Sequence, residues 1–132
     1  MPSIKKIIFS FLLLSGLMIL SAGSQAQIPD EIILSLKSGN SKVLSSYFNQ
    51  NVELVVLDND NVYSKAQAQQ IVSNFFNNYN PESFNVIHQS GKEGAKYLIG
   101  NLNTKNGKFR VYFLLKQNDG KDYIHQLRIE KQ

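Results

Sequence analysis

The sequence predicts an α+β fold in which N-terminal helices pack on a mostly antiparallel sheet. Helical spacing of apolar residues dominates residues 30–79, and alternating strands separated by glycine-bearing turns run from residue 84 to residue 131. Because the turns between these later strands are short, neighbouring strands are expected to pair antiparallel. The predicted order is helix, helix, hairpin, helix and a four-stranded meander.

Residues 1–26 have the three-part pattern of a cleavable secretory signal. Two lysines precede an apolar stretch at residues 7–20, and small residues follow up to Ala26. This stretch of 14 residues is shorter than the roughly 20 residues that span a bilayer. We therefore expect cleavage after Ala26 or Ser24, export to the periplasm or the medium, and no membrane insertion of the mature chain.

Residues 27–132 are expected to form one domain that is held together by packing alone. The chain has no cysteine, so disulfides cannot support the exported domain. It carries 14 basic and 10 acidic residues, and two of the lysines belong to the signal, which leaves a mature net charge of +2. Such a charge gives no reason to expect a nucleic-acid partner. The chain also lacks an Asn-x-Ser/Thr sequon, which favours a bacterial source.

The mature chain opens with helical spacing. Pro29 and the two acids after it suit a first helical turn. Apolar residues keep a helical period across Gly39, so residues 30–49 form either one interrupted helix or two in succession. The hairpin that follows consists of a strand at residues 52–57, a turn at 58–61 and a short strand at 62–63.

The next helix is delimited by signals at both ends. Ser64 and Gln67 have the spacing of a capping box, and Asn80 followed by Pro81 ends the helical pattern. One face carries the apolar residues Ala68, Ile71, Val72, Phe75, Phe76 and Tyr79. The meander then consists of strands at 84–90, 95–104, 108–117 and 121–131, with turns at 90–91, 106–107 and 119–120.

Three segments carry a family resemblance: Tyr63–Ala68, Phe109–Leu115 and Gln126–Lys131. With the element order, they are similar to an uncharacterised family of small secreted bacterial proteins. That family has a nuclear-transport-factor-two-like fold, also called SnoaL-like, with a cystatin-like α+β arrangement. The resemblance implies that residues 27–132 form a single cone domain, with helices on the concave side of a strongly curved sheet. The superfamily includes isomerases, dehydratases, cyclases, ligand-binding domains and association domains, so the fold does not select a function.

A catalytic residue of this fold would be expected inside the cone. His125 shares the strand phase of Leu127 and Ile129, which is predicted to face inward. It is either a neutral core histidine bonded to the backbone or to a tyrosine, or a general base in a pocket. The candidate pocket residues are Tyr47, Tyr97, Tyr123 and His125.

None of the ten acids is predicted to point into the cone, so a carboxylate partner for His125 is missing. We therefore expect an exported non-enzymatic binding or association module, with a small apolar ligand as one partner. The alternative is a small-molecule isomerase, dehydratase or hydrolase-type enzyme that uses His125 as base.

Neither a metal nor a cofactor is expected. His88 and His125 lie on strands that are three steps apart in the meander, about 14 Å. The acidic run from Asp58 has Val62 and Tyr63 where a calcium loop needs an oxygen ligand and a glycine.

The outward face of the sheet also carries apolar residues. The strand at 108–117 alternates so that Tyr112 and Leu114 face away from the helices, beside Ile124 of the last strand. Apolar residues on an exposed sheet face either form a patch that contacts a partner or are single exposed residues of the kind found on any protein surface. The sequence therefore predicts a homodimer through the convex face, with Tyr112, Leu114 and Ile124 at the contact.

Overall fold

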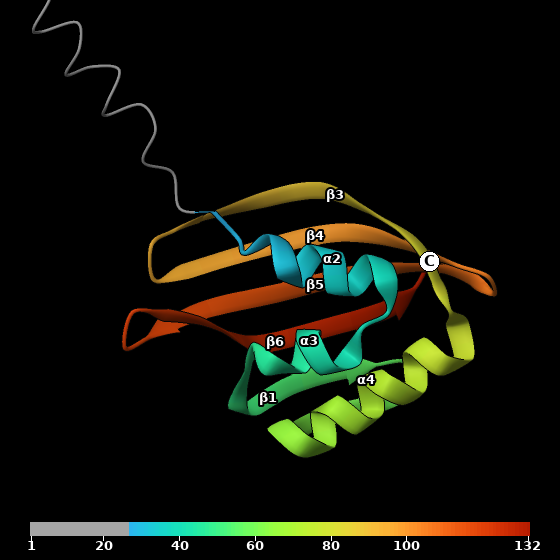
Figure 1. Ribbon diagram of the computed structural model, residues 1–132, viewed down its shortest axis with the longest axis horizontal. Coiled ribbons are helices and arrows are strands. Elements are labelled where there is room, and N and C mark those ends of the chain that lie inside the picture. Colours follow the sequence, from blue (N-terminus) through green and yellow to red (C-terminus); the bar gives the residue numbers. More distant parts are fainter. Residues whose placement is uncertain (1–26) are drawn as a thin grey trace, which may run out of the picture.

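The computed structural model describes residues 27–132, so the predicted signal lies outside the described residues. The described helices are α2 (Asp30–Ser38), α3 (Ser41–Ser46) and α4 (Lys65–Tyr79). The strands are β1 (Phe48–Val56), β2 (Asn59–Ser64), β3 (Pro81–Lys92), β4 (Ala95–Thr104), β5 (Gly107–Asn118) and β6 (Lys121–Lys131). They form one sheet in the order β2-β1-β6-β5-β4-β3 (Figure 1).

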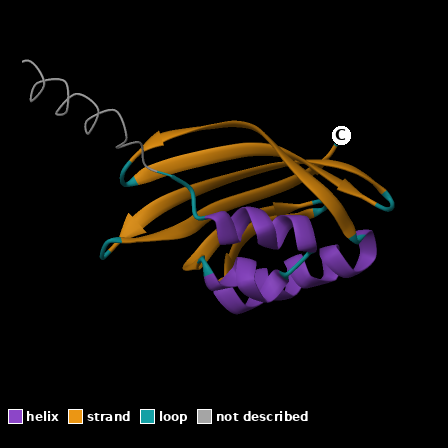
Figure 2. Cartoon of the chain, turned by 45° about the horizontal axis from the view of Figure 1, so that its top comes forward, coloured by secondary structure: helices purple, strands orange, loops and turns teal. Residues whose placement is uncertain are grey.

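The sheet curves around the helices, which all lie on its concave side (Figure 2). Strands β3 to β6 form an antiparallel meander, and the β1–β2 hairpin joins it because β1 pairs parallel with β6. The predicted α+β fold class, with helices on a strongly curved and mostly antiparallel sheet, is confirmed. No helix within residues 27–132 is long and apolar enough to cross a membrane.

The predicted helical region at residues 30–49 contains two helices, which end at Ser46, and residues 48–49 already belong to β1. Gly39 ends α2 in the left-handed conformation, with φ of 69°, which glycine adopts without the steric cost of a side chain. Asn40 then caps α3 by accepting a hydrogen bond from the backbone of Val43. The capping box of Ser64 and Gln67 is present at the start of α4.

Three turns lie away from their predicted positions, and one of them, the β4–β5 turn at residues 105–106, is displaced by a single residue from the predicted 106–107. The β1–β2 turn is at residues 57–58, where Leu57 has φ of 55°, and not at 58–61. The β3–β4 turn is at residues 93–94, so Gly91 belongs to β3. A Cβ atom at Gly91 would lie 2.4 Å from the backbone oxygen of Ala95. Close strand contact and a φ of 127°, and not a turn, therefore explain the glycine at 91.

Apolar side chains fill the space between the helices and the concave face. From the meander, Phe109, Phe113 and Leu115 are fully buried. From α4, Phe75 meets Phe109 edge to face, with ring centroids 5.0 Å apart. The remaining described core residues are Ile28, Ile32, Leu36, Leu44, Phe48, Val52, Leu54, Val56, Ala68, Val72, Phe76, Phe84, Leu98, Leu102, Val111, Ile124, Leu127 and Ile129.

Candidate functional site

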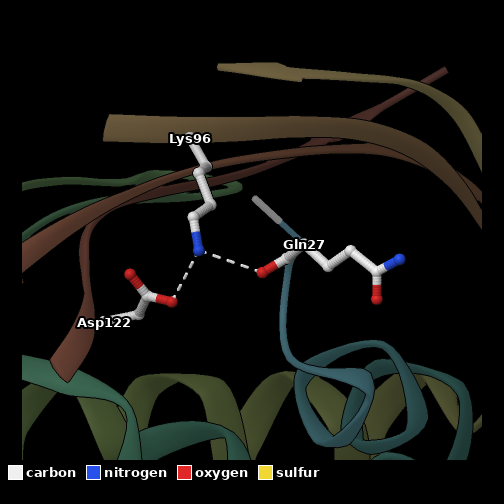
Figure 3. A network of polar contacts seen from close by, with 3 residues as sticks. All are labelled: Gln27, Lys96 and Asp122. Carbon is white, nitrogen blue, oxygen red and sulfur yellow. Dashed lines mark hydrogen bonds and ion pairs between the residues drawn. The ribbon is translucent and has the colours of Figure 1, made fainter. Parts of the chain in front are cut away.

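A buried ion pair lies at one end of the concave face. Lys96 of β4 shares the inward phase of Leu98 and Leu102, and its side chain is only 7% exposed. Its Nζ atom donates to Asp122 Oδ2 at 2.9 Å and to the backbone oxygen of Gln27 at 3.0 Å (Figure 3). A single ammonium group therefore joins β4, β6 and the N-terminal segment.

Burial of this ion pair is costly. Taking a lysine and a carboxylate out of water costs several kcal/mol per ion, which good geometry and additional hydrogen bonds offset. Lys96 has two acceptors, and the Asp122 side chain retains 15% exposure to water. Because an apolar residue at 96 would join the core without this cost, the ion pair is weak evidence for a contribution to stability.

A cleft of about 460 Å³ opens beside Lys96. We call it the N-terminal cleft, because residues 27–33 form one wall and the ends of β3 and β4 form the other. Ile28 and Ile33 supply its apolar contacts, and most of its other side chains are polar. The lining residues are Gln27, Ile28, Asp30, Ile33, Gln89, Ser90, Gly91 and Lys96. The cleft can therefore hold a small polar ligand in contact with Lys96.

The last strand changes phase at a bulge. Leu114 of β5 pairs with Gln126, whereas the next residue, Leu115, pairs with Ile124. His125 is left without a partner in the ladder, and the alternation of side chains shifts by one residue. Side chains before the bulge therefore point to one face of the sheet, whereas continuing the alternation that follows the bulge would place them on the other face.

Tyr123 and His125 consequently lie on the convex face, and the prediction that they point into the cone is wrong. The charged neighbours of His125 are Lys116 and Glu53, both exposed residues. Partial burial lowers the pKa of His125 below its ordinary value. The positive charge of Lys116 lowers this pKa further, and Glu53 opposes the shift to a smaller extent.

The same change of phase brings Ile124 and Asp122 to the concave side. Ile124 is fully buried in the core, so its predicted place on the dimer face is wrong. Asp122 reaches Lys96, so the expectation that no carboxylate faces inward is also wrong. One sequence signal could have indicated the pair: Lys96 precedes Leu98 and Leu102 in the same strand phase, at a position where an apolar residue is expected.

Tyr47 lies outside the N-terminal cleft, at the junction of α3 and β1. Its hydroxyl donates to Glu31 Oε2 at 2.6 Å, which ties this junction to α2. The hydrogen bond, followed by burial and the negative charge of Glu31, raises the pKa of Tyr47 to about 12. Tyr47 also packs against the core, so the structure shows a structural contact for this residue.

Four half-buried apolar side chains lie together on the convex face. Tyr97 pairs with Leu114, and Ile99 pairs with Tyr112, across β4 and β5. The rings of Tyr97 and Tyr112 have centroids 6.2 Å apart, and His88 Nε2 lies 3.2 Å from the Tyr97 hydroxyl. We call Tyr97, Ile99, Tyr112 and Leu114 the outer patch. Tyr97, predicted to line a pocket in the cone, thus belongs to the convex face.

Within the part of the chain that the structure describes, no three His, Cys, Asp or Glu side chains are arranged to hold a metal ion. Two features of the described residues bring polar or apolar side chains together at a surface: the N-terminal cleft with its ion pair and the outer patch. They lie on opposite faces of the sheet.

Solved structures similar to this chain share its fold. A DUF4783 family protein from Bacteroides uniformis ATCC 8492 is 35% identical, with a TM-score of 0.77 over 80% of this chain and 98% of that chain. An NTF2-like protein of unknown function from Cytophaga hutchinsonii ATCC 33406 is 14% identical, with a TM-score of 0.56 over 81% and 93%.

A protein from Xanthomonas campestris, described as a calcium/calmodulin dependent protein kinase II association domain, is 16% identical. Its TM-score is 0.58, over 82% of this chain and 94% of that chain. At 16% and 14% sequence identity, these two structures show a shared fold and not a shared function. No curated protein matches the sequence.

The family model described as Domain of unknown function (DUF4783) matches residues 29–130, which include every described helix and strand except the last residue of β6. The chain belongs to this DUF4783 family of bacterial proteins, and its fold is NTF2-like.

Proposed function

We propose that the mature chain is an exported, non-enzymatic association module whose outer patch pairs with a second copy. The observation that carries the proposal is the outer patch, where parts of four apolar side chains remain exposed in the inner strands β4 and β5. Apolar side chains grouped on one face of a small domain mark interaction sites.

The charges beside the outer patch suit pairing between two identical surfaces. Tyr112 lies opposite Arg128, and Arg110 lies opposite Glu130, on neighbouring strands. Arg128 also forms an exposed ion pair with Glu130 at 2.8 Å. Because both signs of charge occur on this face, a two-fold axis through the patch can bring opposite charges of the two copies together.

The geometry gives little support to an enzyme that uses His125 as base. His125 lies on the convex face and does not line the N-terminal cleft. The concave side is packed with side chains such as Phe109 and Phe113, both fully buried. The small apolar ligand expected in the cone would meet these packed side chains. Binding through a surface is therefore favoured over chemistry or ligand capture within the cone.

The likeness to the association domain from Xanthomonas campestris supports the proposal only as a precedent. It indicates that a domain of this fold can serve in assembly. The contact residues of this chain must be established on the chain itself.

Export rests on the signal pattern of residues 1–26. Expression of the full-length chain in a bacterium, followed by cell fractionation and intact-mass measurement, tests it. A periplasmic or extracellular product with the mass of residues 27–132 supports export. A full-length product that stays in the cytoplasm overturns it.

Size-exclusion chromatography with light scattering on the mature chain tests association. We expect twice the monomer mass at high concentration, falling towards the monomer mass on dilution. Leu114→Lys should give a monomer, because it buries a charge in the contact. Val62→Lys is the matched control, since Val62 is 58% exposed on β2, away from the outer patch. A wild-type monomer at several hundred micromolar overturns the proposal.

A further inference from the structure

The N-terminal cleft contains polar groups that association through the outer patch does not use. Its volume of about 460 Å³ falls within the range of small-molecule sites, about 300 to 1,000 Å³. Amide, hydroxyl and carboxylate side chains surround the apolar contacts of Ile28 and Ile33. This combination of a few polar groups with an apolar surface is typical of a ligand site.

Lys96 is held in a fixed position at this cleft. An ammonium group has three N–H donors, and the contacts within residues 27–132 use two of them, to Asp122 and to the backbone of Gln27. The third donor has no partner within residues 27–132, and because Lys96 lines the cleft we expect this donor to meet an acceptor of a ligand. The two existing contacts hold the side chain in place before binding, which reduces the entropy lost on binding.

Asp30 provides an acceptor within the same cleft. It lies in the first turn of α2, is exposed, and makes no ion pair within the part of the chain that the structure describes. Its carboxylate can accept two or more hydrogen bonds. A ligand in the cleft thus meets a donor at Lys96 and an acceptor at Asp30.

The charge balance of the cleft excludes a simple anion as the favoured ligand. The charge of Lys96 is matched by Asp122, which leaves the negative charge of Asp30. Cleavage after Ala26 would add one α-ammonium group at Gln27, and cleavage after Ser24 would add it two residues earlier. In neither case does the cleft carry net positive charge.

We propose that the N-terminal cleft binds a small, neutral, polyhydroxylated ligand of the saccharide class. A hydroxyl group both donates and accepts, so the hydroxyls of one ligand can accept from Lys96 and donate to Asp30 without a charge mismatch. The amides of Gln27 and Gln89 offer further paired donors and acceptors. This site is separate from the outer patch, so it goes beyond the proposed association and does not depend on it.

Two-dimensional amide NMR of the mature chain, titrated with glucose, N-acetylglucosamine and their disaccharides, tests this inference. We expect saturable shifts confined to residues 27–33 and 89–96 with at least one saccharide. Asp30→Ala should weaken that binding about tenfold, because a hydrogen bond to a charged group is lost. Glu82→Ala is the matched control, because Glu82 is exposed on β3 and does not line the cleft.

Acetate, ethanolamine and glycine serve as anionic, cationic and zwitterionic probes. Shifts at the cleft with one of these and with no saccharide overturn the assignment. The absence of shifts with every saccharide overturns it as well, as does undiminished saccharide binding by Asp30→Ala. The monomeric Leu114→Lys variant should retain the saccharide shifts, which separates this inference from the proposed association.

Discussion

Lys96 Nζ and Asp122 Oδ2 lie 2.9 Å apart and connect β4 to β6 across the intervening strand β5. The strand register explains the geometry, because Lys96 lies opposite Leu115 and Leu115 lies opposite Ile124. The pair therefore crosses the concave face at the end where the N-terminal cleft opens. It also holds the backbone of Gln27 against the sheet.

Asp122→Asn is expected to destabilise the domain by about 3 kcal/mol, because the buried ammonium of Lys96 loses its counter-charge. Lys96→Met should cost less, since the remaining carboxylate is 15% exposed and can turn towards water. Urea unfolding measures both effects. Glu130→Gln is the matched control, because the Arg128–Glu130 pair is exposed and its loss should cost less than about 1 kcal/mol. Equal losses for Asp122→Asn and Glu130→Gln would show that Lys96 does not depend on Asp122 as a buried counter-charge.

Tyr47→Phe is expected to make the free energy of unfolding less dependent on pH in the alkaline range. The pKa of Tyr47 is raised from 10.0 to about 12 in the folded chain, chiefly by the hydrogen bond to Glu31. This contribution is fully present below pH 10.0 and is lost as the pH rises through about 12. Unfolding measured from pH 8 to pH 11 should show a smaller loss of stability in the variant than in the wild type. If the wild type and Tyr47→Phe lose the same amount of stability at alkaline pH, the contribution of the hydrogen bond to Glu31 would be contradicted.

His125 is expected to titrate below its ordinary pKa of 6.5, mainly because of partial burial and then because of Lys116. The unfolded chain therefore takes up this proton at higher pH than the folded chain. The resulting stability is present above pH 6.5 and is lost as the pH falls through the folded pKa. NMR titration of the imidazole should give a higher pKa in Lys116→Gln and a lower one in Glu53→Gln. A wild-type pKa above 6.5 would refute the placement of His125.

Gly100→Ala is expected to destabilise the domain by about 1 to 3 kcal/mol through overpacking. A Cβ at this position would lie 2.3 Å from Phe84 Cζ and 2.9 Å from the backbone oxygen of Asn85. Gly120→Ala is the control, because no atom lies within 4 Å of its Cβ and only its φ of 76° opposes alanine. Thermal unfolding of both variants tests whether Gly100→Ala loses more stability than Gly120→Ala. A larger loss for Gly120→Ala would contradict the packing of β3 against β4.

The fold could be predicted because local and periodic signals agree along most of the chain. The capping box of Ser64 and Gln67 defines the start of α4, and Pro81 follows its C-cap residue, Asn80. The alternation of Phe109, Val111, Phe113 and Leu115 defines the inward face of β5. These signals act within a few residues and do not depend on the partner strand.

The candidate site could not be predicted because it depends on the register between strands. The bulge opposite Leu114 and Leu115 reverses the phase of β6 before Gln126, and β6 is apolar on both phases, at Tyr123 and at Ile124. Alternation within β6 alone therefore cannot show where the bulge lies. Asp122 reaches Lys96 only because of this reversal. The two residues lie far apart in the sequence, so no local pattern connects them.

In the proposed dimer, two copies of the chain meet through the outer patch. Isotope-filtered nuclear Overhauser measurements on an equal mixture of ¹³C-labelled and unlabelled mature chains test it most directly. We expect intermolecular contacts between the methyl groups of Ile99 and Leu114 and the rings of Tyr97 and Tyr112 of the other copy. Intermolecular contacts confined to another surface, or none at concentrations of several hundred micromolar, would contradict it.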